Sequence, residues 1–266
     1  MHATAVQCRA SGLGAEGISS AEEDHLRYYS DFIELPRMPA DCCEKMYQNA
    51  GNLPLLNMIT VAPGTALDIG CGAGDNARIL SERGWRITGI TISAAEAEAA
   101  RRFCERIIVA DCDQGLPATV AGPFDMILIS HLLEHLRRPD RLLNDCHSRL
   151  AVNGLIVVAL PNVLHYHQRF QYLLGKFRYA DAGILDETHL HFYTFDTAKE
   201  LLSNRGFTVT MASVEGTLPW WKTRRLVPAG LRRRIDCAAC RRWPGLFGHQ
   251  MMFIAKPDRR VADVMH

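Results

Sequence analysis

From residue 61 onwards, short apolar runs alternate with longer stretches in which apolar residues recur every three or four positions. The short runs have the length of buried strands, and the longer stretches have the period of helices that pack on one face. The predicted strands are residues 65–69, 86–92, 106–110, 124–129 and 154–160, and the predicted helices between them are residues 75–83, 93–104 and 138–150. This alternation predicts a parallel sheet with helices on both faces.

The pattern changes after residue 160. Residues 161–194 are rich in aromatic residues and histidine and show no strand, so we expect them to pass over the sheet. A helix over 195–205, stopped by Gly206, leads into a sixth strand at 207–214, and a seventh strand is predicted at 250–256. The connection between these two strands is too long for a hairpin loop, so we expect it to contain helices or to have a functional role.

The chain has 266 residues, which a doubly wound, mostly parallel α/β sheet with additions would fill. Insertions at 161–194 and 215–249 would cap this sheet. The parts expected along the chain are a loose tail, N-terminal helices, the sheet domain and a second tail, at residues 1–20, 21–60, 61–256 and 257–266.

The composition indicates the cellular compartment of the protein more clearly than its function. Apolar residues make up 48% and charged residues 22%, which is ordinary for a globular protein. No apolar run is long enough to cross a bilayer, and the first twenty residues lack the apolar core of a signal peptide. Nine cysteines, an odd number spread over predicted core and helices, suit a reducing compartment. We therefore expect a cytoplasmic protein.

The clearest chemical signal is the sequence Asp-Ile-Gly-Cys-Gly-Ala-Gly over residues 68–74, between a predicted strand and a helix. Glycines let the backbone turn sharply and approach a ligand, and parallel sheets build nucleotide sites in this way. A dinucleotide loop needs glycine where this chain has Asp75, and an acid at a helix start would repel a pyrophosphate. The Gly-Lys-Ser/Thr of phosphate-loop proteins is absent. The loop therefore favours a ligand with an adenosine and no phosphate.

The same loop resembles the first motif of the class I, seven-stranded Rossmann-like S-adenosylmethionine-dependent methyltransferases. The resemblance continues in order along the chain. Residues 110–117 resemble the segment whose acid holds the adenine amine, residues 124–136 resemble the fourth strand with its following helix, and residues 150–162 resemble the turn and fifth strand. Four motifs in register imply this fold, with S-adenosylmethionine as cofactor and a small molecule as methyl acceptor.

The resemblance also implies roles for individual residues in holding the cofactor. The glycines would give backbone access to its amino-acid end, and Asp68 would hold its ammonium group. Thr91 stands where the second strand usually ends in an acid that accepts the ribose hydroxyls, and a threonine lacks that charge. Methyltransferases of lipid chains have a similar Gly-x-Thr-x-Ser stretch. The implied cofactor-binding residues are Asp68, Gly70, Cys71, Gly72, Gly74, Thr91, Ile92, Asp111, Cys112 and Ser130.

Residues 183–194 hold the strongest chemical signal outside the glycine loop, with Asp186, His189 and His191 close together in the chain. They resemble a segment in a methyltransferase subgroup linked to polysaccharide and O-antigen assembly. Methyl transfer to a hydroxyl requires that its proton be removed, and histidine suits that role. We expect His189 to be the base, with Asp186 orienting it or holding the substrate, and His131 to line the pocket. The alternative is that Asp186 and Thr188 cap a turn and His189 fills a polar core position.

Metal binding is not expected from the sequence. His131 and His135 are one helical turn apart, but no third ligand is evident near them in the chain. Cysteines at 42, 43, 237 and 240 do not have the spacing of two zinc-ligand pairs.

Residues 220–242 combine two tryptophans and eight basic residues with one acid, Asp236. This stretch is either a solvated helix face or a contact for an anionic surface. Nucleic acid is not expected, because the net charge is only +1.

Our leading interpretation is O-methylation of a small molecule such as a sugar or glycan precursor. Methylation of a lipid or quinone ring at a membrane surface is the first alternative, and a cofactor-binding protein without transfer activity is the second. The oligomeric state is not indicated by the sequence.

Overall fold

The computed structural model describes residues 51–220 and 226–258. The tail expected at 1–20, most of the N-terminal helices expected at 21–60 and residues 259–266 lie outside the described residues.

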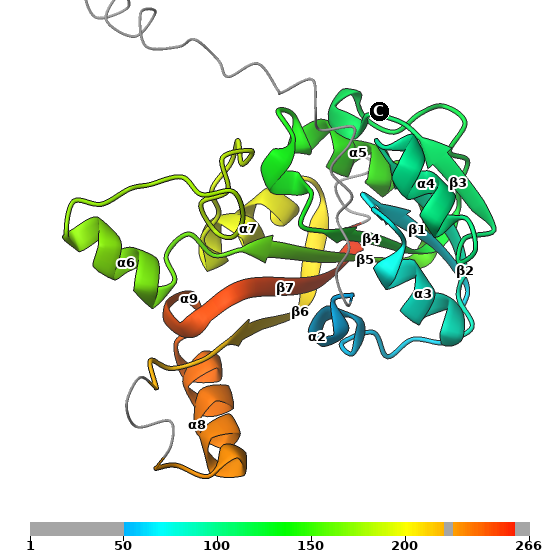
Figure 1. Ribbon diagram of the computed structural model, residues 1–266. Helices are drawn as coiled ribbons and strands as arrows, with labels where there is room; N and C mark the ends of the chain where they lie inside the picture. Colours follow the sequence, from blue (N-terminus) through cyan, green and yellow to red (C-terminus); the bar gives the residue numbers. More distant parts are fainter. Residues whose placement is uncertain (1–50, 221–225, 259–266) are drawn as a thin grey trace, which may run out of the picture. The chain divides into compact units, whose positions relative to one another are not determined.

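One seven-stranded sheet organises the described residues, in the order β3-β2-β1-β4-β5-β7-β6 (Figure 1). The strands are β1 (Thr65–Ile69), β2 (Arg86–Thr91), β3 (Arg106–Val109), β4 (Phe124–Ser130), β5 (Leu150–Pro161), β6 (Phe207–Gly216) and β7 (Gly248–Pro257). The first five strands pair in parallel, and all seven predicted strands are confirmed.

Helices and apolar side chains cover both faces of this sheet. The helices are α2 (Leu53–Leu56), α3 (Asp75–Glu82), α4 (Ala94–Ala100), α5 (Pro139–Arg149), α6 (Tyr166–Leu173), α7 (Phe195–Ser203), α8 (Ala229–Arg242) and α9 (Pro244–Phe247). Neighbouring residues of β4 enter two separate buried clusters: Ile127 joins the one that includes residues of α5 and α7, and Leu128 joins the one that includes residues of α2 and α3. Side chains alternate across a strand, so both faces need apolar residues and the central strands are apolar throughout. Within the described ranges, no helix has the length and apolar content needed to cross a membrane.

The sheet is mixed, which corrects the simple parallel alternation predicted from the sequence. β7 lies antiparallel between β5 and β6. The end of β6 pairs with the start of β7, at Gly216 and Gly248, so α8 and α9 leave and return at the same end of the sheet. A parallel strand would need a connection that crosses to the opposite end.

Two local expectations also change. The turn expected at the start of residues 150–162 is part of the strand, because Asn153 and Gly154 lie inside β5, where the pairing with β4 shifts register. The segment at 161–194 contains a helix, α6, that the sequence pattern did not predict.

Phe253 on β7 tests the core directly. It is fully buried, and its ring lies 5.5 Å from that of Phe195 on α7. We expect Phe253→Ala to lower the free energy of unfolding by about 3–5 kcal/mol, because the cavity cannot fully collapse. Urea unfolding followed by circular dichroism measures this. Val152→Ala is the control, because Val152 is 73% exposed and its truncation should cost about 0.5 kcal/mol or less. Equal losses in the two variants would contradict this account of the core.

Candidate active site

The glycine loop follows β1 and has a backbone that only glycine adopts easily. Gly70, Gly72 and Gly74 have positive φ angles of 75°, 52° and 87°. The amides of Gly70 and Cys71 both donate to the carbonyl of Ile90 at 2.9 Å, which ties the loop to β2. These bonds hold the loop beside the carboxyl ends of β1 and β2, where ligands of α/β sheets bind.

Asp68 lies just before the loop, and its buried carboxyl group has one oxygen without a hydrogen-bond partner among the described residues. Its side chain is 1% exposed, and its Oδ2 atom has no hydrogen-bond partner in the described structure. Burial raises the pKa of Asp68 to about 7. A buried oxygen without a partner is costly, so a positively charged donor that reaches it would be stabilised. The ammonium group of an amino-acid moiety fits this requirement.

Thr91, at the end of β2, shares a hydrogen bond with an acid that lies on the next helix. The Thr91 hydroxyl lies 2.6 Å from Oε2 of Glu96, and both side chains are buried. Ile92 is exposed next to them. A carboxylate therefore lies beside the strand end where the sequence suggested that only a threonine stood. The Ser93-x-x-Glu96 spacing, typical of a helix start, was the available signal.

Asp111 and Cys112 follow the neighbouring strand, β3. The Oδ1 atom of Asp111 accepts a hydrogen bond of 2.9 Å from the amide of Asp113 and so caps a short turn, η2 (Cys112–Gln114). Cys112 is buried, which raises the pKa of its thiol to about 12. The proposed cofactor residues on β1, β2 and β3 thus lie at the ends of adjacent strands.

His131 follows β4 in a backbone conformation that is unusual for a side chain other than glycine, with φ of 54°. Its Nδ1 atom lies 3.2 Å from Oε1 of Glu134, and its Nε2 atom faces Oε1 of Gln250. Loss of water around the ring opposes a charge, but the two oxygen contacts outweigh it and raise the pKa of His131. The ring therefore holds its proton to a higher pH than a free histidine, which makes it a weaker candidate for the base than His189.

A side-chain network joins His131 to the start of the described chain. Asn52 donates to Oγ of Ser130 at 3.2 Å and to Oε1 of Gln250 at 2.9 Å. Gln250 in turn donates to Oε2 of Glu215 at 3.2 Å. Gln250 belongs to this edge although sequence reasoning gave it no role, because β7 joins the sheet antiparallel and brings its first residues here.

The segment at 183–194 brings His189 close to the residues that follow β4. The backbone amides of Leu190 and His191 donate to the carbonyl of Glu134 at 2.8 and 3.1 Å. His189 is 8% exposed, and its ring lies 4.7 Å from that of His135. Burial lowers the pKa of His189, so the ring favours its neutral form.

The contacts of Asp186 match the alternative interpretation, in which Asp186 and Thr188 cap a turn. Its Oδ1 atom accepts hydrogen bonds from the amide and the hydroxyl of Thr188, at 2.8 and 2.6 Å. These bonds cap a turn. His189 instead directs its Nδ1 atom at the carbonyl of Ile184, 3.1 Å away.

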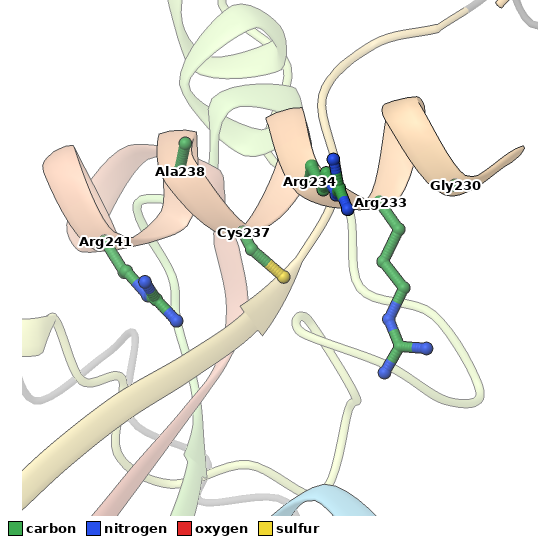
Figure 2. Close-up of a pocket in the computed structure, with 6 residues that line it drawn as sticks. All are labelled: Gly230, Arg233, Arg234, Cys237, Ala238 and Arg241. Carbon is green, nitrogen blue, oxygen red and sulfur yellow. The ribbon is translucent and has the colours of Figure 1, made fainter. Parts of the chain in front are cut away.

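The basic stretch is described except for residues 221–225. α8 packs against β6, the edge strand, and stands apart from the rest of the sheet (Figure 1). Its outer side carries a hollow of about 410 Å³ (Figure 2). The lining residues are Gly230, Arg233, Arg234, Cys237, Ala238 and Arg241. Asp236, the one acid, is buried and accepts a hydrogen bond of 2.7 Å from the Trp220 indole.

Comparison with known proteins places this geometry in a family. A model of the methyltransferase domain matches residues 43–212. The ubiquinone biosynthesis O-methyltransferases of Psychrobacter arcticus and of a Caulobacter species are 31% identical over 103 residues and 34% identical over 101 residues. Each match covers 36% of this chain, and the chain spans only 40% of the length of either relative.

Solved structures agree at the level of the fold. An S-adenosylmethionine-dependent methyltransferase from Archaeoglobus fulgidus has 24% identity and a TM-score of 0.53, over 76% of this chain and 91% of that chain. One from Mesorhizobium loti has 18% identity and a TM-score of 0.52, over 76% and 95%. The chain belongs to the methyltransferase domain family, and it has the fold of solved S-adenosylmethionine-dependent methyltransferases.

Proposed function

We propose that this protein methylates a hydroxyl group on an aromatic ring of the quinone-precursor class. The observation that carries this choice of acceptor is a run of aromatic side chains that leads away from His189. Ring centroids lie 6.3 Å apart from His189 to Phe192, 5.9 Å from Phe192 to Phe177 and 5.4 Å from Phe177 to Tyr179. Phe177 and Tyr179 are exposed. Such a surface suits an apolar ring and its substituents.

The names of the curated relatives support a ring over a sugar, although their matches cover a limited part of each chain. The sugar or glycan precursor that we first expected has no comparable support among the described side chains. The same holds for the O-antigen subgroup. We therefore prefer the quinone alternative.

In the proposed cofactor site, S-adenosylmethionine supplies an activated methyl group when bound. Asp68 would accept the ammonium group, and the backbone of the glycine loop would lie along the amino-acid end. Thr91 and Glu96 would face the ribose hydroxyls, with Asp111 toward the adenine amine. The oxygen of Asp68 that has no partner fits this assignment best, because the ligand would complete its hydrogen bonding.

His189 is the proposed acceptor of the hydroxyl proton. Its Nδ1 atom faces a carbonyl oxygen and so carries the hydrogen of the neutral ring, which leaves Nε2 able to take a proton. The lowered pKa keeps this atom unprotonated near neutral pH. Asp186 would act through Thr188, by fixing the turn that carries His189.

α8 supports action at an anionic membrane surface. Arg233, Arg234 and Arg241 surround the outer hollow, and Leu231 and Ile235 are exposed along the same helix. Basic residues attract anionic lipid, and exposed apolar side chains enter the interface. An enzyme for a lipid-soluble ring benefits from such a position.

The acceptor class is tested with methyl-labelled S-adenosylmethionine and separate pools of dihydroxylated aromatic rings, nucleotide sugars and phospholipids. We expect label in the aromatic pool, on oxygen, because the exposed run of rings favours that acceptor. Label only in the sugar pool would contradict this proposal and support O-methylation of a sugar or glycan precursor. Cofactor binding without transfer to any pool would favour a protein that binds and does not react.

Asp68 makes cofactor binding depend on pH. Because its pKa is about 7, the carboxyl is mostly protonated at pH 6, and an arriving ammonium group would displace that proton. We expect affinity to rise between pH 5.5 and 7.5, with proton release that calorimetry in two buffers measures at pH 6. Asp68→Asn should bind weakly and release no proton. Glu98→Gln is the control, since Glu98 is exposed on α4.

The same residue affects the stability of the protein without cofactor. The pKa of Asp68 is higher in the folded state than its ordinary value of 3.8. Its stabilising contribution is therefore present at low pH and is lost as pH rises from about 4 to 7. Asp68→Asn should remove this part of the pH dependence of the melting temperature. An unchanged profile in the variant would contradict the raised pKa.

The role of α8 is tested with vesicles. Replacing Arg234 and Arg241 by Glu should weaken sedimentation with anionic vesicles at least about tenfold, because each basic residue near such a surface contributes about 1 kcal/mol. Replacing Arg101 and Arg102 by Glu makes the same change of charge on the α4 side and should have a smaller effect. Equal effects would mean that net charge alone acts, and binding to neutral vesicles of equal strength would argue against an electrostatic contact.

A further inference from the structure

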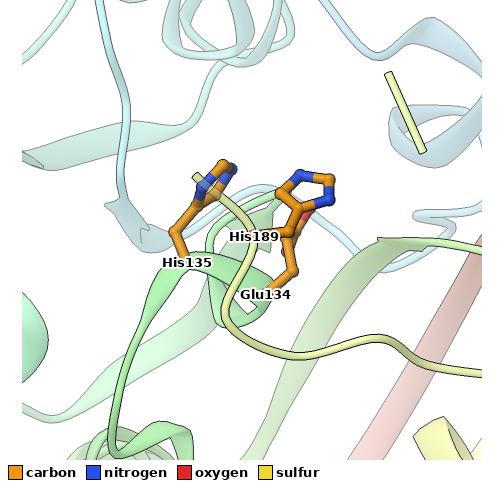
Figure 3. Close-up of side chains that lie close together, drawn as sticks. All are labelled: Glu134, His135 and His189. Carbon is orange, nitrogen blue, oxygen red and sulfur yellow. The ribbon is translucent and has the colours of Figure 1, made fainter. Parts of the chain in front are cut away.

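Glu134 and His135 have no role in the proposed chemistry, yet they lie close to His189, the proposed base. Glu134 and His135 lie in the short turn η3 (Leu133–His135) after β4, and His189 lies in the segment that passes over the sheet. One oxygen or nitrogen atom from each of the three lies within 4.8 Å of the others (Figure 3).

Glu134 has a buried oxygen that lacks a partner. The side chain is fully buried, and Oε1 contacts His131 while Oε2 has no hydrogen-bond partner among the described residues. Burying a carboxylate oxygen without a donor or cation is costly. His131 satisfies Oε1, so Oε2 is the oxygen of the carboxylate that is left without a donor or a cation.

Both histidine rings have their Nδ1 atoms in contact with oxygen atoms of the protein, as metal-binding histidines usually do. Nδ1 of His135 lies 3.0 Å from the hydroxyl of Thr188 and 3.3 Å from its carbonyl, and Nδ1 of His189 lies 3.1 Å from the carbonyl of Ile184. A ring that donates from Nδ1 to a carbonyl presents Nε2 without a hydrogen, and metal-binding histidines are usually fixed by such a contact. Asp186 accepts a hydrogen bond from the Thr188 hydroxyl and so fixes the position of the group that contacts His135.

We propose that Glu134, His135 and His189 bind one divalent cation. Two imidazoles and one carboxylate suit zinc, cobalt, manganese or ferrous iron better than magnesium or calcium, which prefer oxygen. Ligands around zinc lie roughly 3.4 Å apart, so each pair of the three atoms would approach by at most about 1.4 Å on binding. Three protein ligands leave an open position, which a hydroxyl of the acceptor can occupy.

The binding site stands on geometry alone, whereas its part in catalysis rests on the proposed function. A bound cation would lower the pKa of an acceptor hydroxyl, which could then release its proton to water. In the cation-loaded enzyme His189 is a ligand and not the base. The sequence alone shows no third ligand near His135, because 54 positions separate it from His189 in the chain.

The test uses the full chain, stripped with a chelator and titrated with cobalt(II) alone. We expect one cobalt ion per chain with visible absorption of a nitrogen- and oxygen-ligated ion, and displacement by zinc. His189→Ala and His135→Gln should each weaken binding at least about 100-fold. His167→Ala is the matched control, because His167 is an exposed histidine on α6 and should leave binding unchanged.

Folding of each variant is checked by its affinity for S-adenosylmethionine, which should stay near that of the parent chain. Glu134→Gln is a second probe that keeps the shape of the buried side chain. The proposal is overturned if cobalt fails to bind stoichiometrically, or if it binds folded His189→Ala as tightly as the parent. Cobalt binding without methyl transfer to any acceptor would instead count against the proposed function, so the two failures are distinct.

Discussion

Two acidic side chains are buried at the carboxyl edge of the sheet, and the rest of the structure must offset the cost of burying them. Asp68 and Glu134 each have one oxygen without a hydrogen-bond partner, at the ends of the adjacent strands β1 and β4. The apolar clusters on both faces offset the cost of these groups by removing large side chains from water. The stability of the sheet thus allows two buried carboxyl groups at one edge, each with an oxygen that has no partner among the described residues.

Much of the fold was predictable because its causes are local. Residues 65–69 form β1 as the apolar run predicts, and the glycines that follow have the positive φ angles that their identity suggests. The run of four motifs along the chain led to the correct cofactor class, since each motif ends a strand and therefore reaches the same edge. Patterns of period and turn chemistry were sufficient for these features.

Contacts between distant segments were not predictable. His189 and Glu134 meet because the segment at 183–194 is bonded to the carbonyl of Glu134, and no periodicity in the sequence encodes that bond. Gln250 reaches His131 because β7 runs antiparallel, a property of the connection through α8 and not of the strand itself. The contact between Glu96 and Thr91 was not predicted either, because the position of Glu96 in the chain indicates only the first turn of a helix.

The position of β7 has a consequence for when the site exists during synthesis. Among the described strands β7 comes last along the chain, yet it lies inside the sheet, between β5 and β6. Until residues 248–257 leave the ribosome, β5 and β6 have no common neighbour and His131 lacks Gln250. A nascent chain without β7 therefore already has the glycine loop bonded to β2 but lacks the strand that brings Gln250 to His131.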